Sequence, residues 1–299
     1  MQIRMLSEVL REQYGCKVLK LSLTSGCTCP TRDGTKGRDG CSFCSAGGSG
    51  EFAARYAPLK EQILEAKSLV DGKFPKDLPP SGRRYIAYFQ SFTNTYGDRA
   101  SLEALYREVL DIPEIVILSI GTRPDCLGDE MVGMLAGLKR IKPVWVELGL
   151  QTIHEDTAEA VGRGYTLAVF EDAYRRLKDA GLQVIVHLIF GLPEETEGMM
   201  LDSVKYLAGL NPGIDGIKLQ QLCILKGTRL AAKYQAEPFP IMSMEAYTDL
   251  VVKSLAILPD GTVIHRLTGD PPKQLLIAPS WCKDKKRVLG TLQMKIRTS

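Results

Sequence analysis

The stretch LAVFEDAYRRLKDAGLQVIVHLIF, residues 167–190, contains the unit that decides the fold. Its first half places apolar side chains at helical spacings of three and four: Leu167, Phe170, Tyr174 and Leu177. Gly181 follows as a C-cap, and the apolar run 184–190 comes next. That run has the length and composition of a strand that is buried on both faces. A helix followed by such a strand predicts one unit of a parallel sheet.

The same alternation continues outward through most of the chain. Apolar runs predict strands at residues 17–23, 85–89, 115–120, 144–150, 184–190 and 216–222. Helical periods predict helices between them at residues 59–69, 102–110, 129–139, 167–180 and 198–207. Six such units predict an α/β fold, a partial (βα)6 TIM-like barrel with an N-terminal extension and a site at the carboxyl ends of the strands. A doubly wound open sheet is the alternative.

This rhythm stops near residue 236, and we expect a barrel core at residues 1–236 followed by an extension at 237–299. The extension predicts a helix at 244–257, a strand at 262–267 and a basic tail. Because six units cannot close an eight-stranded barrel, we expect this closing segment to cover the open side.

The composition is that of an ordinary globular protein. The 299 residues carry a net charge of +3, with 44% hydrophobic and 24% charged residues, which excludes disordered and fibrous classes. The sequence has no run of about 18 apolar residues that would predict a membrane span. The first residues lack the apolar segment of a signal peptide, so we expect a cytoplasmic protein.

Four of the eight cysteines fall in one loop after the first predicted strand. Residues 27–44 read CTCPTRDGTKGRDGCSFC, in which Cys41 and Cys44 form a C-x2-C metal pair and Cys29 or Cys27 adds a third thiolate. A structural zinc site would need four ligands, but the loop 27–48 contains no histidine. Three thiolates on an iron–sulfur cluster would instead leave one iron open. The pattern favours the cluster over zinc.

The loop resembles that of radical SAM enzymes with the spacing C-x11-C-x2-C, and especially the YhcC/YtqA-like branch. This branch is related to the Elongator catalytic subunit and to oxygen-independent coproporphyrinogen oxidase. Further matching motifs run along the chain: residues 88–90, 121–126, 147–152, 163–164, 187–193, 216–219, 226–228, 265–266 and 278–282. The resemblance implies that Cys29, Cys41 and Cys44 bind a 4Fe–4S cluster and that Cys27 does not. It also implies reductive cleavage of S-adenosylmethionine (SAM), with an electron from a flavodoxin- or ferredoxin-type donor.

Several side chains near predicted strand ends are candidate cofactor contacts: Phe43, Gln90, Ser91, Thr93, Gln151, Arg163 and His187. The resemblance implies that Phe43 packs over the cluster and that Gln151 and Arg163 contact SAM, Arg163 through the carboxylate. The alternatives are a helix cap for Gln151 and a surface charge for Arg163. His187 interrupts an apolar strand, so it is either a cofactor or substrate contact or a hydrogen-bonded core residue.

Four residues are candidates for a catalytic role: Glu147, His265, Arg266 and Cys282. Glu147 shares an interior strand face with Gln151 and is expected either to contact ribose or a cationic substrate, or to form a buried ion pair. His265, Arg266 and the Trp281-Cys282 pair are expected to approach the substrate from the closing segment. Cys282 is either a hydrogen-atom donor or an inert buried thiol.

The substrate is the least determined feature. Residues 283–287 with Lys295 and Arg297 hold six positive charges and one negative charge, which suits either a polyanion or a solvated end. The resemblance implies modification of tRNA, at the C5 substituent of the wobble uridine. A radical SAM enzyme acting on a small metabolite or peptide is the first alternative, and a zinc-stabilised binding protein is the second.

Overall fold

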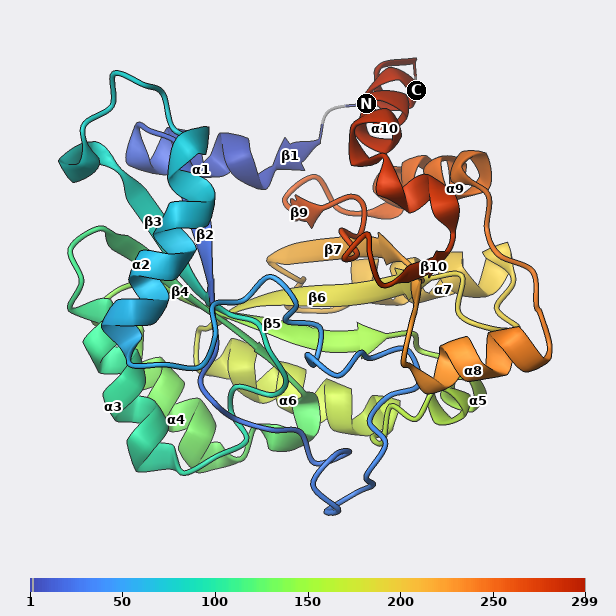
Figure 1. Ribbon diagram of the computed structural model, residues 1–299, viewed down its shortest axis with the longest axis horizontal. Coiled ribbons are helices and arrows are strands. Elements are labelled where there is room, and N and C mark those ends of the chain that lie inside the picture. Colours follow the sequence, from blue (N-terminus) through green and yellow to red (C-terminus); the bar gives the residue numbers. More distant parts are fainter. Residues whose placement is uncertain (2, 299) are drawn as a thin grey trace.

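The computed structural model describes residues 1 and 3–298. Two residues lie outside the described ones: Gln2, in the predicted core, and Ser299, at the end of the predicted extension. The described residues form one parallel eight-stranded sheet in the order β1-β9-β7-β6-β5-β4-β3-β2 (Figure 1). Its strands are β1 (Arg4–Met5), β2 (Val18–Leu23), β3 (Arg84–Phe89), β4 (Ile115–Thr122), β5 (Val144–Gln151), β6 (Gln183–Phe190), β7 (Gly216–Gln221) and β9 (Val263–Arg266).

Strands β2 to β7 lie side by side in the order of the sequence. A doubly wound sheet would reverse its strand order at a switch point, so that alternative is wrong and the partial TIM-like barrel is confirmed. β8 (Ile224–Leu225) pairs with β10 (Leu276–Ala278) as a small antiparallel ribbon.

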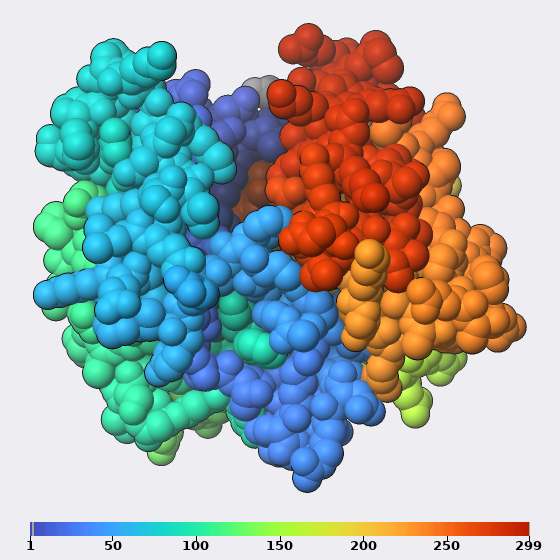
Figure 2. Space-filling view, in the orientation of Figure 1, coloured from blue at the N-terminus to red at the C-terminus, as the bar shows by residue number. Residues whose placement is uncertain are grey.

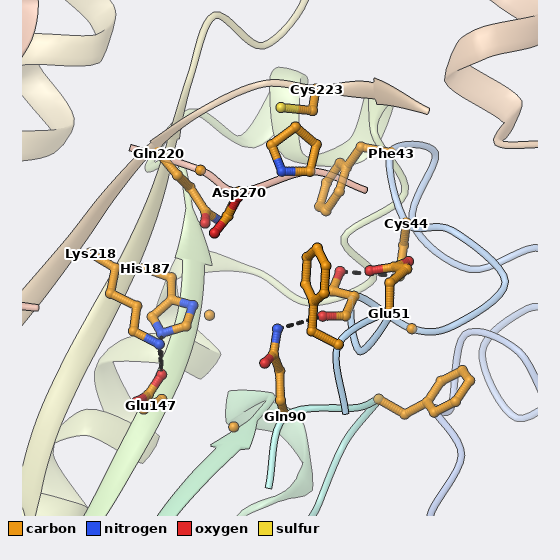
Figure 3. Close-up of a pocket in the computed structure, with 18 of the residues that line it drawn as sticks. Phe43, Cys44, Glu51, Gln90, Glu147, His187, Lys218, Gln220, Cys223 and Asp270 are labelled. Carbon is orange, nitrogen blue, oxygen red and sulfur yellow. Dashed lines mark hydrogen bonds and ion pairs between the residues drawn. The ribbon is translucent and has the colours of Figure 1, made fainter. Parts of the chain in front are cut away.

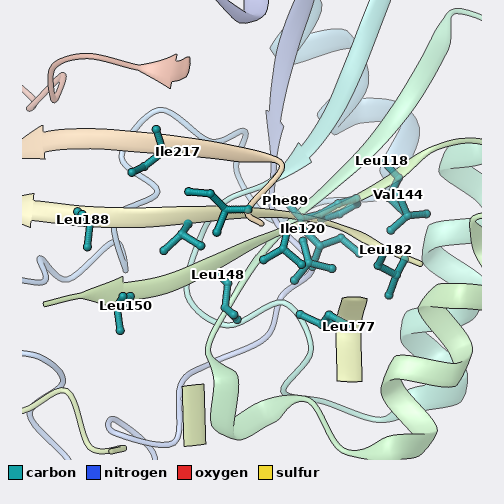
Figure 4. Packing of buried hydrophobic residues seen from close by; sticks show 14 of the residues in the cluster. Phe89, Leu118, Ile120, Val144, Leu148, Leu150, Leu177, Leu182, Leu188 and Ile217 are labelled. Carbon is teal, nitrogen blue, oxygen red and sulfur yellow. The ribbon is translucent and has the colours of Figure 1, made fainter. Parts of the chain in front are cut away.

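Helices follow most of these strands and pack against the outer face of the sheet. They are α2 (Leu59–Val70), α3 (Arg99–Leu110), α4 (Asp129–Leu138), α5 (Glu155–Ala160), α6 (Leu167–Asp179) and α7 (Glu197–Ala208). In α6 the predicted apolar face is buried, and Gly181 takes the left-handed conformation with φ +68° one residue after the C-cap Ala180. Leu177 of α6 faces Leu148 and neighbouring strand residues in the core (Figure 4). Truncating such a buried leucine to alanine costs about 2–5 kcal/mol.

The sequence did not predict four of the α-helices. α1 (Leu6–Tyr14) places Leu10 against Ile117, Trp145 and Ile185, and thereby fills the amino-terminal end of the barrel. The others are α5, α8 (Arg229–Ala236) and α10 (Lys285–Thr298). Short 3-10 turns lie at Asp71–Lys73, Pro80–Gly82, Pro124–Cys126 and Ser280–Lys283.

The C-terminal segment is built into the barrel. β9 lies between β7 and β1 in the sheet, as the expected extra strand next to the last βα unit. The predicted helix 244–257 is α9 (Met244–Ile257). The segment expected as a basic tail is instead helix α10, which buries Val288, Leu292 and Ile296 and packs on α9. The prediction of a tail considered only the charge of this segment. It overlooked the apolar residues at helical spacing that lie between the lysines and arginines.

None of the helices within residues 1 and 3–298 is both long and apolar enough to span a membrane.

Candidate active site

A cavity of about 890 Å³ opens at the carboxyl ends of the strands, where barrel enzymes bind their substrates. Its wall brings together the cysteine loop, the ends of β3 to β7 and residues 269–274 (Figure 3). Figure 2 shows the face on which the cysteine loop, in blue, lies between the segment around α2 and the C-terminal segment in red. The volume lies in the range of sites that enclose a cofactor-sized ligand.

Cys29, Cys41 and Cys44 all line this cavity. Arg32 holds the loop in shape by donating hydrogen bonds to the carbonyl oxygens of Cys44 (2.9 Å) and Ser45 (2.6 Å). Its guanidinium lies where a Cβ on Gly40 would be, and Gly40 has φ +73°. Only glycine fits both the close approach and the left-handed backbone at that position.

The donor set fits an iron–sulfur cluster. Burial, followed by the neighbouring Cys44, raises the pKa of Cys41 to about 12, and burial also raises the pKa of Cys44. Because burial disfavours the ionised form, these thiolates are stable only beside a positive charge, which a bound metal centre supplies. Among the described residues, no three His, Cys, Asp or Glu side chains converge closely enough to hold one metal ion. The three thiols thus line one cavity without forming a single-ion site.

The thiol of Cys27 lies outside the cavity that the other three cysteines of the loop line. Its Sγ would lie 3.0 Å from a Cβ built on Gly97, just before α3. Burial raises its pKa. The division between three ligands and one spare thiol stays a prediction, and Cys27 lies outside the cavity that the other three thiols line.

The candidates around the second βα loop divide into two groups. Phe43, Gln90 and Thr93 line the cavity, and the amide of Gln90 donates to the Ser49 carbonyl at 2.7 Å (Figure 3). Ser91 is absent from the lining, because its side chain packs under the loop where a Cβ on Gly50 would collide with it. Its expected cofactor contact is therefore not favoured; Ser91 supports the loop instead.

Gln151 lines the cavity from the end of β5 in a strained conformation. Its φ is +65°, and the register between β5 and β6 shifts between Gly149 and Gln151. Its side-chain oxygen accepts a hydrogen bond from the Tyr165 hydroxyl at 3.0 Å. Bulges and left-handed non-glycine residues re-aim side chains at functional sites. The geometry favours a ligand contact over a helix cap.

Arg163 is 1% exposed, so its interpretation as a surface charge is wrong. It donates hydrogen bonds to the carbonyl oxygens of Leu150, Thr152 and Tyr165 and to the carboxylate of Glu155. Four of its five N–H groups are thus directed to protein acceptors. Arg163 lines the cavity but chiefly braces the end of β5, and its pairing with SAM stays a prediction.

Sequence reasoning missed Arg123 as a site residue. It lines the cavity, forms a two-point ion pair with Asp125 at 2.9 Å, and stacks on Tyr165 with 4.9 Å between the guanidinium carbon and the ring centroid. The signal was its place in the motif at residues 121–126, directly after a predicted strand. An arginine held in this way presents its remaining donors to an anion.

A buried polar layer crosses the barrel interior below the cavity. It takes one side chain from each of six strands: Lys20, Tyr88, Ser119, Glu147, His187 and Lys218. Glu147 is its centre and accepts hydrogen bonds from Lys20 (2.8 Å), Ser119 (2.8 Å), His187 (3.0 Å) and Lys218 (Figure 3). The buried ion pair that was one alternative for Glu147 is thus present.

Charges in this layer follow from burial and contact. Burial would raise the pKa of Glu147, but Lys20 and Lys218 hold it well below its usual value. Burial and then Lys218 lower the pKa of His187 to about 4, so its ring is neutral at neutral pH. Because Glu147 is ionised and only accepts, Nε2 of His187 carries the proton and Nδ1 stays free to accept.

Lys20 and Lys218 were missed, although each is a lysine inside an apolar strand, the same signal that singled out His187. Burial also lowers the pKa of Lys218, against the opposing effect of Glu147. Strand pairing cannot be read from hydrophobic runs, so the shared contact of one carboxylate with both ammonium groups was not predicted.

The structure places the candidate residues of the closing segment in different parts of the molecule. Arg266 lines the cavity, and its guanidinium lies 3.5 Å from the Gln220 side-chain oxygen. His265 lines a separate cavity of about 530 Å³ at the amino-terminal ends of the strands, with its ring 5.1 Å from that of Trp145. This location does not favour the expected substrate contact, because the barrel core separates it from the upper cavity.

Cys282 and Trp281 are likewise absent from the cavity wall. Cys282 is 5% exposed and lies behind Cys223, and Trp281 packs on Tyr247 with 5.5 Å between ring centroids. The part of the closing segment that covers the cavity is residues 269–274. The closing segment therefore covers the cavity as expected, but residues 269–274 form the cover in place of Trp281 and Cys282.

A parallel half-barrel with three cysteines of one loop at its carboxyl end defines the radical SAM class. The chain belongs to the radical SAM superfamily: the superfamily profile matches residues 34–207, and the Radical_SAM C-terminal domain profile matches residues 214–298. It is 41% identical over 288 residues to the uncharacterized protein YtqA of Bacillus subtilis, covering 96% of this chain and 87% of YtqA. It is 34% identical over 284 residues to protein YhcC of Escherichia coli, covering 95% and 88%.

Among solved structures, the fold is similar to Elp3 of the archaeon Methanocaldococcus infernus with an N-terminal deletion. The TM-score is 0.68 at 17% identity, covering 93% of this chain and 63% of that one. The chain thus spans less than two thirds of the archaeal protein.

The cofactors of this superfamily are a 4Fe–4S cluster and SAM. When bound, they supply one-electron cleavage of SAM to a 5′-deoxyadenosyl radical. The residues that would hold these groups line the cavity: Cys29, Cys41 and Cys44 would bind the cluster, polar groups of β3 to β7 would surround the ligand, and residues 269–274 form part of the wall.

Proposed function

We propose that this radical SAM enzyme modifies tRNA at the C5 substituent of a wobble uridine. A flipped nucleotide would enter the cavity from the face that carries the cysteine loop, and the 5′-deoxyadenosyl radical would take a hydrogen atom from it. The protein would act in the cytoplasm, with a flavodoxin- or ferredoxin-type electron donor.

The observation that carries the RNA part is the position of the basic first turn of α10. Lys285 pairs with Asp270 at 2.6 Å, and Asp270 lines the cavity. Lys283, Lys286 and Arg287 are exposed in the same short segment. A cluster of cations next to a cavity mouth suits a polyanion whose reactive base must reach the interior. The similarity in fold to archaeal Elp3 is consistent with this proposal.

Two other functions make different predictions. An enzyme for a small metabolite or peptide would cleave SAM but would not bind RNA. A zinc-stabilised binding protein would contain zinc and would not cleave SAM.

The test uses the anaerobically reconstituted protein with reductant, SAM and bulk tRNA, and it follows nucleosides by mass spectrometry. Binding of unmodified tRNA is measured over a salt series, because affinity that rests on phosphate contacts falls as salt rises. The double variant Lys286→Glu/Arg287→Glu should bind tRNA at least tenfold more weakly. Lys205→Glu, at an exposed position of α7, is a charge-reversal control away from this segment and should bind like the wild type. Absence of salt-dependent tRNA binding would reject the RNA substrate and favour the small-molecule alternative.

A further inference from the structure

Two thiols from distant parts of the chain meet beside the cavity. Sγ of Cys223, just after β7, lies 4.0 Å from Sγ of Cys282, in the turn after β10. Cys223 lines the cavity, whereas Cys282 is buried behind it. Both thiols are free. One of the two sulfurs thus faces the ligand space and the other is its immediate neighbour.

Gln221 fixes this arrangement. Its amide nitrogen donates to Cys282 at 2.9 Å, and its oxygen accepts from the Gly269 N–H (2.8 Å) and the Thr268 hydroxyl (3.1 Å). The end of β7, the thiol pair and the start of the stretch that covers the cavity are therefore held by one side chain. A buried amide that is fully hydrogen-bonded holds its partners in one geometry.

We propose that Cys223 donates a hydrogen atom to a carbon-centred radical in the cavity and that Cys282 captures the resulting thiyl radical. This goes beyond the sequence-based interpretation, in which Cys282 alone was the donor candidate. It requires only the radical chemistry of the superfamily and is independent of the RNA substrate.

The reaction balances as follows. The S–H bond of Cys223 breaks homolytically and a C–H bond forms on the radical carbon. Cys282 releases its proton to solvent, and its sulfur bonds to the Cys223 sulfur to give a disulfide radical anion. That species passes one electron to an oxidised iron–sulfur or flavin carrier and becomes a disulfide. A thioredoxin-type dithiol then returns two electrons and two protons by thiol–disulfide exchange.

The surroundings suit a hydrogen-atom donor. The contact with Cys282, followed by burial, raises the pKa of Cys223 well above its ordinary value, so the thiol keeps the hydrogen that it must transfer. Disulfide formation requires the sulfurs to approach from 4.0 Å to about 2.05 Å, a distance that small side-chain rotations can cover.

The first test needs neither SAM nor RNA. The holoenzyme is equilibrated in glutathione buffers of rising potential, free thiols are alkylated, and the tryptic peptides 219–226 and 274–283 are analysed. We expect these two peptides to become disulfide-linked in the wild type and in the remote control Cys16→Ser, but not in Cys223→Ser or Cys282→Ser. If both peptides stay alkylated in the most oxidising buffer, the proposal is wrong.

The second test follows hydrogen transfer. Holoenzyme, SAM and a low-potential reductant are incubated in D2O without substrate, so that the 5′-deoxyadenosyl radical is quenched inside the cavity. We expect 5′-deoxyadenosine with one solvent deuterium in the wild type and in Cys16→Ser, and at least a fivefold lower deuterated fraction in Cys223→Ser. Iron content and circular dichroism check that each variant is folded. Equal deuterium in Cys223→Ser and the wild type would overturn the donor role, whatever the outcome with tRNA.

Discussion

Nε2 of His187 lies 3.0 Å from Oε2 of Glu147, across the neighbouring strands β5 and β6. This contact lies in the barrel interior, where Glu147 is 1% exposed and also pairs with Lys20 and Lys218. It links the floor of the cavity to the stability of the barrel, because a buried carboxylate without its partners would be costly.

Replacing Glu147 with Gln should be strongly destabilising. The change leaves Lys20 and Lys218 without their shared counter-charge, and breaking a buried ion pair costs about 3–5 kcal/mol. Urea denaturation of the apoprotein measures the loss. Glu197→Gln, which removes an exposed pair with Lys253, should cost less than about 1 kcal/mol. Similar losses for the two variants would show that the buried layer does not depend on its central charge.

Acid should destabilise the protein through His187. Its pKa falls from the ordinary 6.5 to about 4 in the fold, so below pH 6.5 the unfolded chain binds the extra proton more readily. This contribution to stability is complete above pH 6.5 and is lost as the pH falls toward 4. Between pH 7 and pH 5 the wild type should lose about 2 kcal/mol more stability than His187→Gln. Parallel pH profiles for the two proteins would contradict the neutral buried histidine.

The cluster ligands make a prediction about metal content. Cys29→Ala, Cys41→Ala and Cys44→Ala should each lose iron and sulfide after anaerobic reconstitution, because all three thiols line one cavity. Cys27→Ala should retain both, because its thiol packs beside Gly97 away from the cavity. A Cys27→Ala protein without a cluster, together with a Cys29→Ala protein that keeps one, would reverse the assignment.

The strained backbone at Gln151 should lower the stability of the protein, whereas its side chain should contribute to SAM binding. Because φ is +65° there, Gln151→Gly should be about 1 kcal/mol more stable than Gln151→Ala, since glycine has no Cβ in the left-handed region. If the amide contacts SAM, both variants should bind SAM about tenfold more weakly, a loss of about 1.4 kcal/mol. Denaturation and equilibrium binding measure the two effects separately. Unchanged SAM affinity in both variants would leave Gln151 with only its bond to Tyr165.

Deleting residues 238–299 should abolish turnover and lower stability. The deletion removes β9, which lies between β7 and β1, and with it residues 269–274 of the cavity wall. Exposed strand edges and an uncovered cavity should follow, seen as aggregation and loss of SAM cleavage. A truncated protein that folds and turns over normally would refute the closing role of the segment.

The sequence by itself determined the strands and helices of the six βα units and the loop that carries the three cysteines. These features are local: a buried strand is a short apolar run, an amphipathic helix repeats every three to four residues, and a metal loop keeps its ligands within a few residues. The same locality explains the prediction of the strand at 262–267 and of α9.

Only the tertiary structure decided which side chains meet. Glu147 faces Lys20, 127 residues away, and Cys223 faces Cys282, 59 residues away. It also separated His265 and Cys282 from the cavity wall and placed residues 269–274 there instead. The physical reason is that strand order, register and barrel curvature set these distances, whereas hydrophobic periodicity fixes only the face of an element that is buried.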